Sequence, residues 1–347
     1  MRATQKSLVT RRTLSVLVAI STAVVLAACS GTGGAGTPEG TAEAGTEAVT
    51  VSLDWNSYVA YHAPFVLADE EGIWEKHGVQ VKHTMPGGSG DALLEVGTAK
   101  TDIAWADLST AAASMLQEVP VTAVAKVQNK NASGLTVLAG TQLDSARDVS
   151  GMRIGSTPGG SDSTLVGAFL RANGIDEADV EIVSLPANGK FAALMTGEVD
   201  AISGQVYYYI SNAASQGATA AGKSYSDMGL DVLDHGFVAN DAFLEANPSA
   251  VTGFLAAYRE ALARTIDDPA AACAVLSSKS DGALLPDDCE AQLDGWLPLV
   301  SDPNESSWGE SSEAEWESTV AVLKEFGGAE GDRQTSTMFT NEVLPND

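Results

Sequence analysis

Short strand-like segments alternate with helical segments along most of this chain, and they do so in two successive series. The first series begins at Val49–Leu53 and ends at Pro120–Val127. The second begins at Leu135–Leu138 and ends near Val199–Ile202. Strands that alternate with helices form mostly parallel sheets that helices cover. The pattern therefore predicts an α/β fold with mostly parallel sheets.

The two series share a local pattern, which indicates two lobes built on similar plans. In the first series, Gly97 ends a helix and leads into a short strand that Asp102 opens. In the second series, Gly197 and Asp200 repeat this arrangement. About 300 residues follow Val49, which is too many for one small core and suits two lobes.

The last third of the chain is predicted to be more helical. Asn247–Pro248 is an N-cap and first-turn pair, and apolar residues recur at helical spacing from Val251 onward. Such stripes pack in cores more often than they face ligands. We therefore expect the tryptophans of this region to be structural, namely Trp296, Trp308 and Trp316.

The first 29 residues have the pattern of an export signal. Four basic residues come first: Arg2, Lys6, Arg11 and Arg12. The apolar run Thr13–Ala28 follows, whose 16 residues suit a signal-peptide core and are few for a membrane span. Leu26–Cys29 resembles the lipobox of bacterial lipoproteins. We expect residues 1–28 to be a removed signal peptide and Cys29 to carry a lipid anchor on the extracytoplasmic face of the cell membrane.

Two alternatives to lipidation remain open, an ordinary cleaved signal and a short helical anchor. The export route, Sec or twin-arginine, is open as well. Residues 29–48 are predicted to be a flexible tether, because they are almost entirely Ser, Gly, Thr, Ala, Pro and Glu.

The chain without its predicted signal peptide is strongly acidic. The whole chain has a net charge of −27, and removing residues 1–28 takes away four of its 19 basic residues and none of its 46 acidic ones, which leaves −31. Such a surface repels nucleic acid, so nucleic-acid binding is disfavoured. The charge favours solubility and says little about the ligand.

The chain has three cysteines, and lipidation of Cys29 would leave Cys273 and Cys289 as a pair. Outside the cytoplasm, two thiols 16 positions apart are expected to form a disulfide, with two free buried thiols as the alternative. The four histidines do not cluster with cysteines, so no metal site is predicted.

Several short motifs, taken in order, resemble those of solute-binding proteins of ABC importers. The branch that they resemble takes nitrate, sulfonates, taurine or precursors of the thiamine pyrimidine. Each motif is loose alone, but their order and spacing across most of residues 49–330 are specific for the family, though not for the ligand. The motifs are Leu53–Trp55, His62–Ala68, Glu71–Trp74, Gly78–Val79, Pro86–Gly88, Gly97 with Asp102, Val119–Val121, Asp148–Gly155, Gly197–Ala201 and Asn247–Pro248.

The resemblance implies the two-lobed periplasmic-binding-protein fold of type II, with a ligand cleft between the lobes. Two crossing strands would join the lobes, near Asn129–Ser133 and near His235–Val238. Lobe one would then be residues 49–131 plus 237–347, and lobe two residues 132–236.

The ligand is expected at the carboxyl ends of strands, where helix N-termini point hydrogen-bond donors inward. Four loops qualify, after the first three strands and after the first strand of lobe two, and the segment 205–209 joins from the far side of lobe two. The candidate ligand-binding residues are Asp54, Trp55, Tyr61, His62, Gly88, Ser89, Trp105, Asp107, Ser161, Asp162, Gln205, Tyr207 and Tyr208.

Each kind of candidate also has a structural interpretation. The glycine-rich loops suit the cradling of an anion by backbone N–H groups, or they are plain turns. Ser161 is a ligand contact or an N-cap. Asp162 would attract an amine or aminopyrimidine, or it faces water at a helix start. The aromatic residues suit a flat heterocycle or a cation, although some of them must be core. His62 is either a ligand contact or a packing residue.

The function that the resemblance implies is capture of a small solute by lobe closure and its delivery to an ABC permease. A thiamine-precursor pyrimidine or similar N-heterocycle is favoured, with alkylsulfonate, taurine or nitrate as the alternative. We expect a monomer that needs no cofactor and performs no covalent chemistry. Fungal relatives that make the thiamine pyrimidine carry a cysteine-rich motif, and this chain has no such cluster, so an enzyme is disfavoured. A ligand-sensing lipoprotein is the remaining class.

Overall fold

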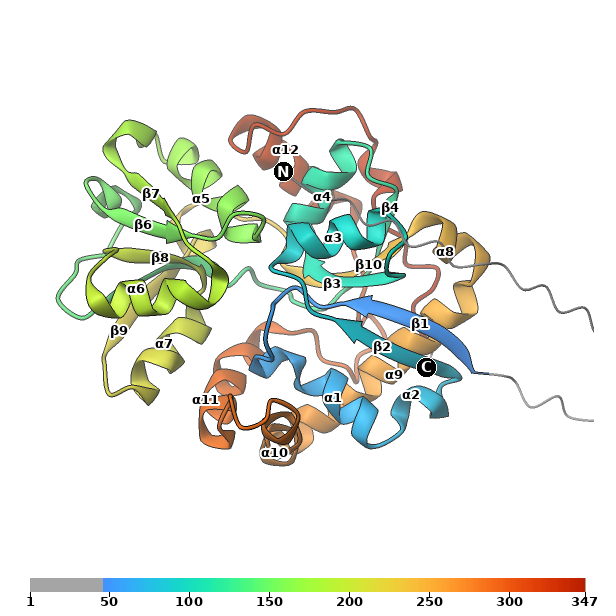
Figure 1. Cartoon of the computed structure of the whole chain (residues 1–347). Coiled ribbons are helices and arrows are strands. Elements are labelled where there is room, and N and C mark those ends of the chain that lie inside the picture. The colour runs from blue at the N-terminus through green and yellow to red at the C-terminus, as the bar shows by residue number, and fades with distance from the viewer. Residues whose placement is uncertain (1–45, 347) are drawn as a thin grey trace, which may run out of the picture. The chain divides into compact units, whose positions relative to one another are not determined.

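The computed structural model describes residues 46–346 and contains two five-stranded sheets with helices on their faces (Figure 1). The α/β class predicted from the alternating segments is confirmed. The predicted signal peptide, the lipidation site Cys29 and the tether up to residue 45 lie outside the described residues. Within residues 46–346, no helix has both the length and the apolar character needed to cross a membrane.

The first sheet has the strand order β2-β1-β3-β10-β4. Strands β2 and β3 run parallel to β1, whereas β10 runs antiparallel to both β3 and β4. The bounds are β1 Glu47–Ser52, β2 Val79–Thr84, β3 Ile103–Asp107, β4 Val121–Lys126 and β10 His235–Asn240.

The second sheet repeats this plan, with the order β7-β6-β8-β5-β9. Strands β7 and β8 are parallel to β6, and β5 is the antiparallel strand that joins β8 to β9. The bounds are β5 Ser133–Leu138, β6 Arg153–Ser156, β7 Glu181–Ser184, β8 Ala201–Gln205 and β9 Ala220–Ser224. The two series of the sequence therefore fold into two sheets of the same topology.

The chain passes between the sheets twice, and in each case the antiparallel strand of the sheet follows the crossing. The first crossing leads from β4 to β5 and the second from β9 to β10. We call the parts around the first and second sheets lobe one and lobe two. The predicted limits 49–131 with 237–347 and 132–236 stay predictions, and β10 takes His235 and Gly236 into the first sheet.

Helices cover both faces of the first sheet (Figure 1). Alternation along β3 shows why, because Ile103 and Trp105 enter one core and Ala104 and Ala106 enter the other. One face is covered by α1 Ala63–Glu70, α2 Ile73–Lys76, α9 Pro248–Asp267, α10 Pro269–Lys279 and α11 Pro286–Trp296. The other is covered by α3 Ser89–Gly97, α4 Leu108–Leu116 and α12 Glu313–Glu325.

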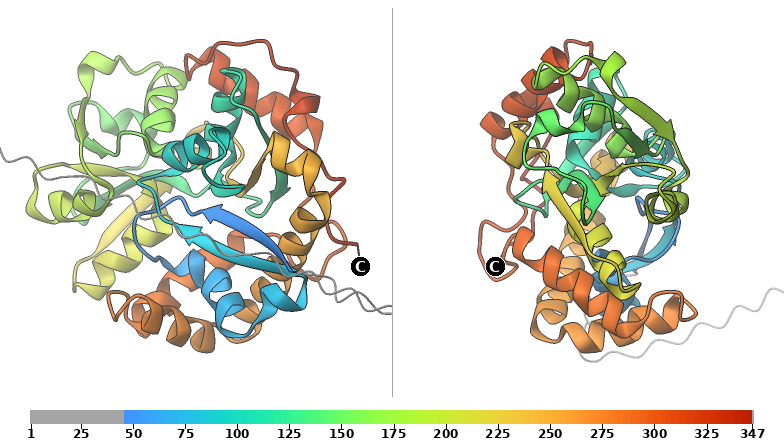
Figure 2. Two further views of the ribbon diagram at one scale, coloured as in Figure 1. Left: turned by 45° about the vertical axis from the view of Figure 1, so that its right-hand side comes forward. Right: turned by 90° about the vertical axis from the view of Figure 1, so that its left-hand side faces the viewer.

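The second sheet is also covered on two faces. Helix α5 Ser161–Ala172 packs on one face, where Leu135, Ile154 and Phe169 meet. Helices α6 Lys190–Thr196 and α7 Val206–Ser215 contribute to the core on the other face. Figure 2 shows the two sheets from two further directions, with α12 beside α4. The remaining helix of the described part is α8 Asp241–Ala246, just before α9.

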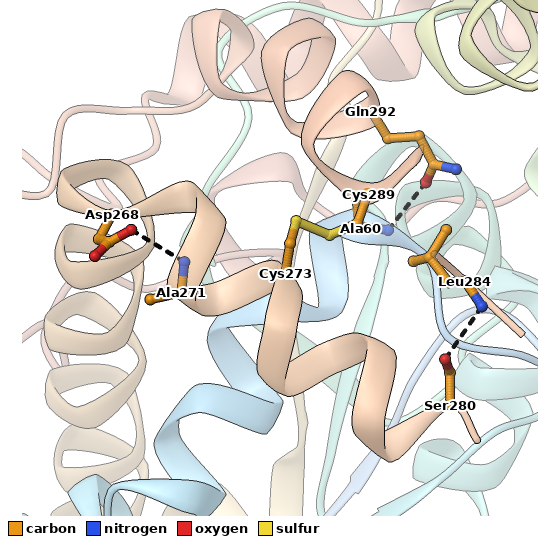
Figure 3. The surroundings of a disulfide bond; sticks show 8 residues. All are labelled: Ala60, Asp268, Ala271, Cys273, Ser280, Leu284, Cys289 and Gln292. Carbon is orange, nitrogen blue, oxygen red and sulfur yellow. Dashed lines mark hydrogen bonds between the residues drawn. A yellow bond between two sulfur atoms is a disulfide. The ribbon is translucent and has the colours of Figure 1, made fainter. Parts of the chain in front are cut away.

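A disulfide joins α10 to α11 in lobe one (Figure 3). The Cα atoms of Cys273 and Cys289 are 5.6 Å apart, and neither side chain is exposed to solvent. The pair is buried because α10 packs against α1 and α11 against α10. The three tryptophans predicted to be structural, Trp296, Trp308 and Trp316, are buried in lobe one.

One expectation from the sequence needs correction. The predicted tether extends to residue 48, but β1 begins at Glu47, because Glu47 and Ala48 pair with Val79 and Gln80 of β2. The sequence pattern predicts no element for residues 206–209, and they begin α7. Its consecutive tyrosines hid the helical period, so the direction of each ring could not be predicted.

Candidate functional site

A pocket lies between the two lobes, and residues of both lobes line it. Nine of the predicted site residues are among its lining, namely Asp54, Trp55, Tyr61, Gly88, Ser89, Ser161, Asp162, Gln205 and Tyr208. The remaining lining residues are Val59, Ser133, Gly160, Lys190, Gly204, Tyr209 and His235. The arrangement follows from the fold, because the carboxyl ends of the parallel strands of each sheet point into the gap between the lobes.

Four predicted site residues do not line this cavity. His62 and Trp105 are fully buried in the core of lobe one, beside Tyr61. Asp107 caps α4 and accepts hydrogen bonds from Ser109 and Thr110. Tyr207 lies on another side of α7 from Tyr208 and Tyr209. Its Cβ occupies the space that a Cβ on Gly295 would need. The packing interpretation therefore describes His62 in this structure.

Asp54, two residues after β1, is the centre of a buried hydrogen-bond network. Its Oδ1 accepts a bond of 3.1 Å from the Tyr61 hydroxyl, and its Oδ2 lies 2.6 Å from His235 Nε2. Burial would raise the pKa of Asp54, but the nearby His235 cation and its hydrogen bond outweigh burial and hold that pKa well below its usual range. The carboxylate is therefore charged at neutral pH.

His235 is held between two carboxylates. Its Nε2 meets Asp54, and its Nδ1 is hydrogen-bonded to Asp234 Oδ1. Burial would lower the pKa of His235, but the charges of Asp54 and Asp234 outweigh it and raise that pKa well above the usual value. The imidazolium therefore stays protonated and bridges the two acids. The neighbouring His62 has the opposite shift, since burial lowers its pKa.

Asp234 connects this network to both crossings between the lobes. It lies on the second crossing, directly before β10, and its Oδ2 accepts a bond of 2.7 Å from the backbone N–H of Ala132 on the first crossing. Asn131 supports the same junction with a bond of 3.1 Å to the carbonyl of Leu233. The site and the hinge thus share one set of hydrogen bonds.

Lobe two contributes a buried ion pair to the cavity. Lys190 Nζ, at the start of α6, lies 2.6 Å from Asp162 Oδ2 and 2.8 Å from the carbonyl oxygen of Ser203. Asp162 is 3% exposed, so it does not face water, and the amine that it meets is the protein's own. The Lys190 ammonium also lies 5.6 Å from the ring centroids of Trp55 and Tyr209.

The two glycine-rich loops meet across the gap. Gly88 and Gly160 are the N-caps of α3 and α5, and no side chain caps either helix. A Cβ on Gly88 would lie 2.9 Å from the Cα of Gly160, so the close approach requires glycine. The backbone N–H of Gly90 donates a bond of 3.0 Å to the carbonyl of Gly159. The loops therefore serve as a contact between lobes as well as a lining of the cavity.

The charges that line the cavity are already paired. Among the described lining residues, the cations are Lys190 and His235, and each contacts a carboxylate at 2.6 Å. With Asp54, Asp162 and the adjoining Asp234, carboxylates outnumber these cations. Two helix N-termini add partial positive charge and bring the site close to neutrality. The cavity therefore suits a neutral or weakly charged ligand better than a strong anion.

Three side chains next to the cavity have metal-ligand chemistry. Asp107, Asp234 and His235 bring one ligand atom each within 4.8 Å of one another. His235 Nδ1 and Asp234 Oδ1 are hydrogen-bonded to each other, and His235 Nε2 is bonded to Asp54. A metal ion would have to displace these bonds, so the group is better described as a hydrogen-bond network.

Lys190 and His235 were missed as site residues by reasoning from the sequence. Lys190 follows β7, and the loop after that strand was not included among the loops expected to reach the ligand. His235 stands at a predicted crossing, next to an acidic residue, and a histidine in that position is a usable signal. Tyr209 differs from Tyr207 and Tyr208 only by its angle around α7, which the sequence did not reveal.

A family model and the curated relatives of this chain agree with each other. A family model described as NMT1/THI5 like matches residues 59–272. The 4-amino-5-hydroxymethyl-2-methylpyrimidine phosphate synthase of Schizosaccharomyces pombe is 23% identical over 236 residues, which cover 65% of this chain and 67% of that protein.

Two solved periplasmic binding proteins share the fold of this chain. The periplasmic aliphatic sulphonate binding protein SsuA of Escherichia coli matches with a TM-score of 0.68 and 18% identity, over 84% of this chain and 97% of that chain. The periplasmic nitrate-binding protein NrtA of Synechocystis matches with a TM-score of 0.54 and 16% identity, over 70% and 69%. The predicted two-lobed periplasmic-binding-protein fold is thereby confirmed, whereas the ligand is not determined at such identities.

Proposed function

Because the chain belongs to the NMT1/THI5-like family, we propose that it is the extracytoplasmic substrate-binding lipoprotein of an ABC importer. Its ligand is a small nitrogen heterocycle of the thiamine-precursor pyrimidine type. The ligand sits in the cavity between the lobes, and an ABC permease receives it. The protein acts as a monomer anchored by lipid at Cys29.

The observation that carries the ligand class is the pairing of charges in a cavity with aromatic walls. Lys190 and His235 are each neutralised by a carboxylate, so neither is free to bind a strong anion. Trp55 and Tyr208 lie on opposite lobes and contact each other edge to face, with ring centroids 6.4 Å apart and ring planes at 69°. A flat heterocycle can pack on the face of either ring, and its amino group would find a carboxylate oxygen in Asp162 Oδ1.

Capture works by closure of the lobes on the ligand. A ligand that contacts both lobes favours the closed conformation by its differential affinity for that state. Lobe one contributes Asp54 and Trp55 to the site. Lobe two contributes Asp162 and Tyr208, and the site is complete only when the lobes meet. A permease that recognises the closed shape then receives loaded protein in preference to empty protein.

The proposal treats the chain as a binding protein and not as an enzyme. The synthase relatives are fungal, and the cysteine-rich motif expected of them is not matched here, because Cys273 and Cys289 are bonded to each other away from the cavity. The lining side chains of the cavity bind and orient a ligand without a bond being broken. Unchanged mass of the recovered ligand after binding supports this assignment, and a converted product would contradict it.

A second candidate ligand is an aliphatic sulfonate. The uncapped N-termini of α3 and α5 face the cavity and offer backbone N–H groups to an anion. This candidate has the weaker support, because sulfonate binding would leave a full negative charge beside Asp54 and Asp162 without an unpaired cation.

A ligand panel tests the proposal. Thermal unfolding of the full chain is measured with 4-amino-5-hydroxymethyl-2-methylpyrimidine, ethanesulfonate, taurine and nitrate. We expect the pyrimidine to raise the melting temperature, since a ligand at 100 times its Kd adds about 2.7 kcal/mol. A shift with a sulfonate or nitrate and none with the pyrimidine would transfer the function to the second candidate. No shift with any compound would overturn the importer proposal.

The anchor is tested separately. Metabolic labelling with a fatty-acid probe should mark the wild-type protein, and Cys29→Ala should remove the label. The variant should keep the ligand-induced shift in melting temperature, because the residues that line the cavity begin at Asp54. Label that persists in Cys29→Ala contradicts acylation at this residue.

A further inference from the structure

Helices α11 of lobe one and α7 of lobe two form a second contact between the lobes. The Ser211 hydroxyl donates a bond of 3.0 Å to the carbonyl of Ala291, and Gln292 Nε2 donates a bond of 3.1 Å to Asn212 Oδ1. Gly295 allows Tyr207 to approach, since a Cβ at this position would lie 2.6 Å from the Tyr207 Cβ. This contact is separate from the meeting of the glycine loops at Gly88–Gly90.

Gln292 stands at the centre of this contact and has a second partner. Its Oε1 accepts a bond of 3.1 Å from the backbone N–H of Ala60 (Figure 3). Ala60 begins the short 3-10 turn Ala60–His62, and Tyr61 of that turn lines the cavity and donates to Asp54. One buried amide group, 2% exposed, thus joins α7 of lobe two to the turn that shapes the lobe-one side of the site.

The position of Gln292 is fixed by the disulfide that joins its helix, α11, to α10. Cys289 precedes it by one helical turn on α11 and is bonded to Cys273 of α10. Helix α10 in turn packs against α1, which directly follows the Ala60–His62 turn. The side chain therefore projects from a helix that is joined covalently to the body of lobe one.

We propose that Gln292 is a positioning residue that holds the lobes in the closed conformation, with the disulfide-linked pair α10–α11 as its rigid support. The inference deepens the proposed function, since it concerns how the binding protein stays closed around its ligand. Gln292 does not line the cavity, and it acts through Asn212 and the Ala60–His62 turn. Its effect is therefore on the population of the closed state and not on ligand contacts.

A backbone amide on the opposite side of the cavity reports closure without any ligand. Gly90 is the second residue of α3, and an N–H at this position has no partner within its own helix. In this structure, where the two lobes are in contact, it donates to Gly159 of lobe two, and opening would release it to solvent. Hydrogen exchange of the Gly90 amide therefore measures how often the lobes part.

The experiment compares Gly90 exchange by NMR in the ligand-free full chain and in Gln292→Leu, which has similar size and no amide. Loss of one hydrogen bond between the lobes should speed the exchange about fivefold. Asn212→Ala should have a similar effect, and the double variant should exceed neither single variant by much, because both remove the same bond.

Thr265→Val is the matched control. Thr265 is buried in α9 of lobe one, and its hydroxyl donates to Ala261 within the same helix. The control should lower stability without changing Gly90 exchange. Unchanged exchange in Gln292→Leu, equal acceleration in Thr265→Val, or a wild-type Gly90 amide that already exchanges like an unprotected one would each overturn the inference.

The readout separates this inference from the proposed function. If no compound of the panel binds, the importer proposal fails while the exchange result for Gln292 still stands. If the pyrimidine binds, Gln292→Leu should speed Gly90 exchange in the pyrimidine-saturated protein by the same factor as in the ligand-free protein, because the lost bond stabilises the closed conformation in both. Unchanged exchange in the saturated variant would limit the residue to the ligand-free protein and contradict its role in capture.

Discussion

Each lobe brings one buried carboxylate to the cavity, and the two differ in the partner that neutralises them. Asp162 of lobe two pairs with Lys190 at 2.6 Å, and both residues belong to the same lobe. Asp54 of lobe one pairs at 2.6 Å with His235, which directly follows the second crossing. The pair in lobe two is thus complete by itself. The pair in lobe one depends on the hinge, because His235 is also bonded to Asp234 and through it to Ala132.

The difference implies two tasks. The Lys190–Asp162 pair keeps the shape of one half of the site whether the lobes are open or closed. The Asp54–His235–Asp234 network ties the other half of the site to the two crossings, so a change in its charge should reach the hinge. The predictions below separate these tasks, beginning with the largest expected effect.

The largest effect is expected from breaking the self-contained pair. Lys190→Met leaves Asp162 charged and without its cation in a buried place, which should lower the free energy of unfolding by about 3–5 kcal/mol. Adding Asp162→Leu should recover most of the loss, since the unpaired charge is then gone. Denaturant unfolding measures both.

Lys100→Met is the control for this prediction. The Lys100 side chain is 65% exposed and pairs with Glu95 at the surface, so its loss should cost less than about 1 kcal/mol. Equal losses in Lys190→Met and Lys100→Met would show that the buried pair is not the strong element of lobe two.

The next largest effect is expected from removing the disulfide, which joins two helices of lobe one. Cys273→Ala with Cys289→Ala should lower the free energy of unfolding by about 3 kcal/mol, because the bond spans 16 residues of the denatured chain. Unfolding with reductant should bring the wild type to the same midpoint and leave the double variant unchanged. A double variant as stable as the wild type would show that packing of α10 on α1 is sufficient.

The two aromatic walls should differ in their effect on ligand affinity. Trp55→Ala removes a ring that faces the cavity and also lies near the Lys190 ammonium of the other lobe, so Kd should rise about tenfold or more. Tyr208→Ala removes only an aromatic ring of the cavity lining, and we expect Kd to rise about fivefold. Trp55→Phe should retain most of the affinity. Calorimetry with the pyrimidine measures all three, and equal effects of Trp55→Ala and Tyr208→Ala would contradict the added role of Trp55.

The sequence predicts a site residue where local structure decides its position, and it misses one where packing between distant segments decides. Asp54, Trp55, Ser161 and Asp162 follow strand ends, and the rule that ligands bind at carboxyl ends of strands is enough to place them beside the cavity. Trp105 lies within β3, where alternation turns it into the core of lobe one.

The remaining errors come from long-range packing. Tyr207 and Tyr208 are neighbours in sequence, but on α7 their side chains differ by about 100°, and only the docked helix decides which one meets the cavity. His235 reaches Asp54 across 181 positions of sequence, and no local pattern reveals such a pair. The repeated plan of the two sheets was visible because it rests on local alternation, whereas the charge pairs were not.

The sharpest test of the comparison is the dependence of stability on pH. The pKa of His235 is raised well above its usual value of about 6.5, because Asp54 and Asp234 outweigh burial. Above pH 6.5 the folded protein therefore holds a proton that the unfolded chain releases. The stabilisation is complete below that pH and is lost as pH rises toward the folded-state pKa, by up to about 1.4 kcal/mol per pH unit.

The window from pH 7 to 9 tests this proton by comparison with His235→Gln, because burial and the charge of Asp234 also raise the pKa of the neighbouring Asp107. Burial raises the pKa of Asp69 to about 6, below the window. The lowered pKa of Asp54 gives a stabilisation that is lost only in acid. Urea unfolding at several pH values should show a falling free energy for the wild type and a nearly flat one for His235→Gln. Lys190→Met, although much less stable, should keep the slope of the wild type, because its pair is separate from the hinge. A flat profile in the wild type, or an equal slope in His235→Gln, would remove the distinction between the two pairs.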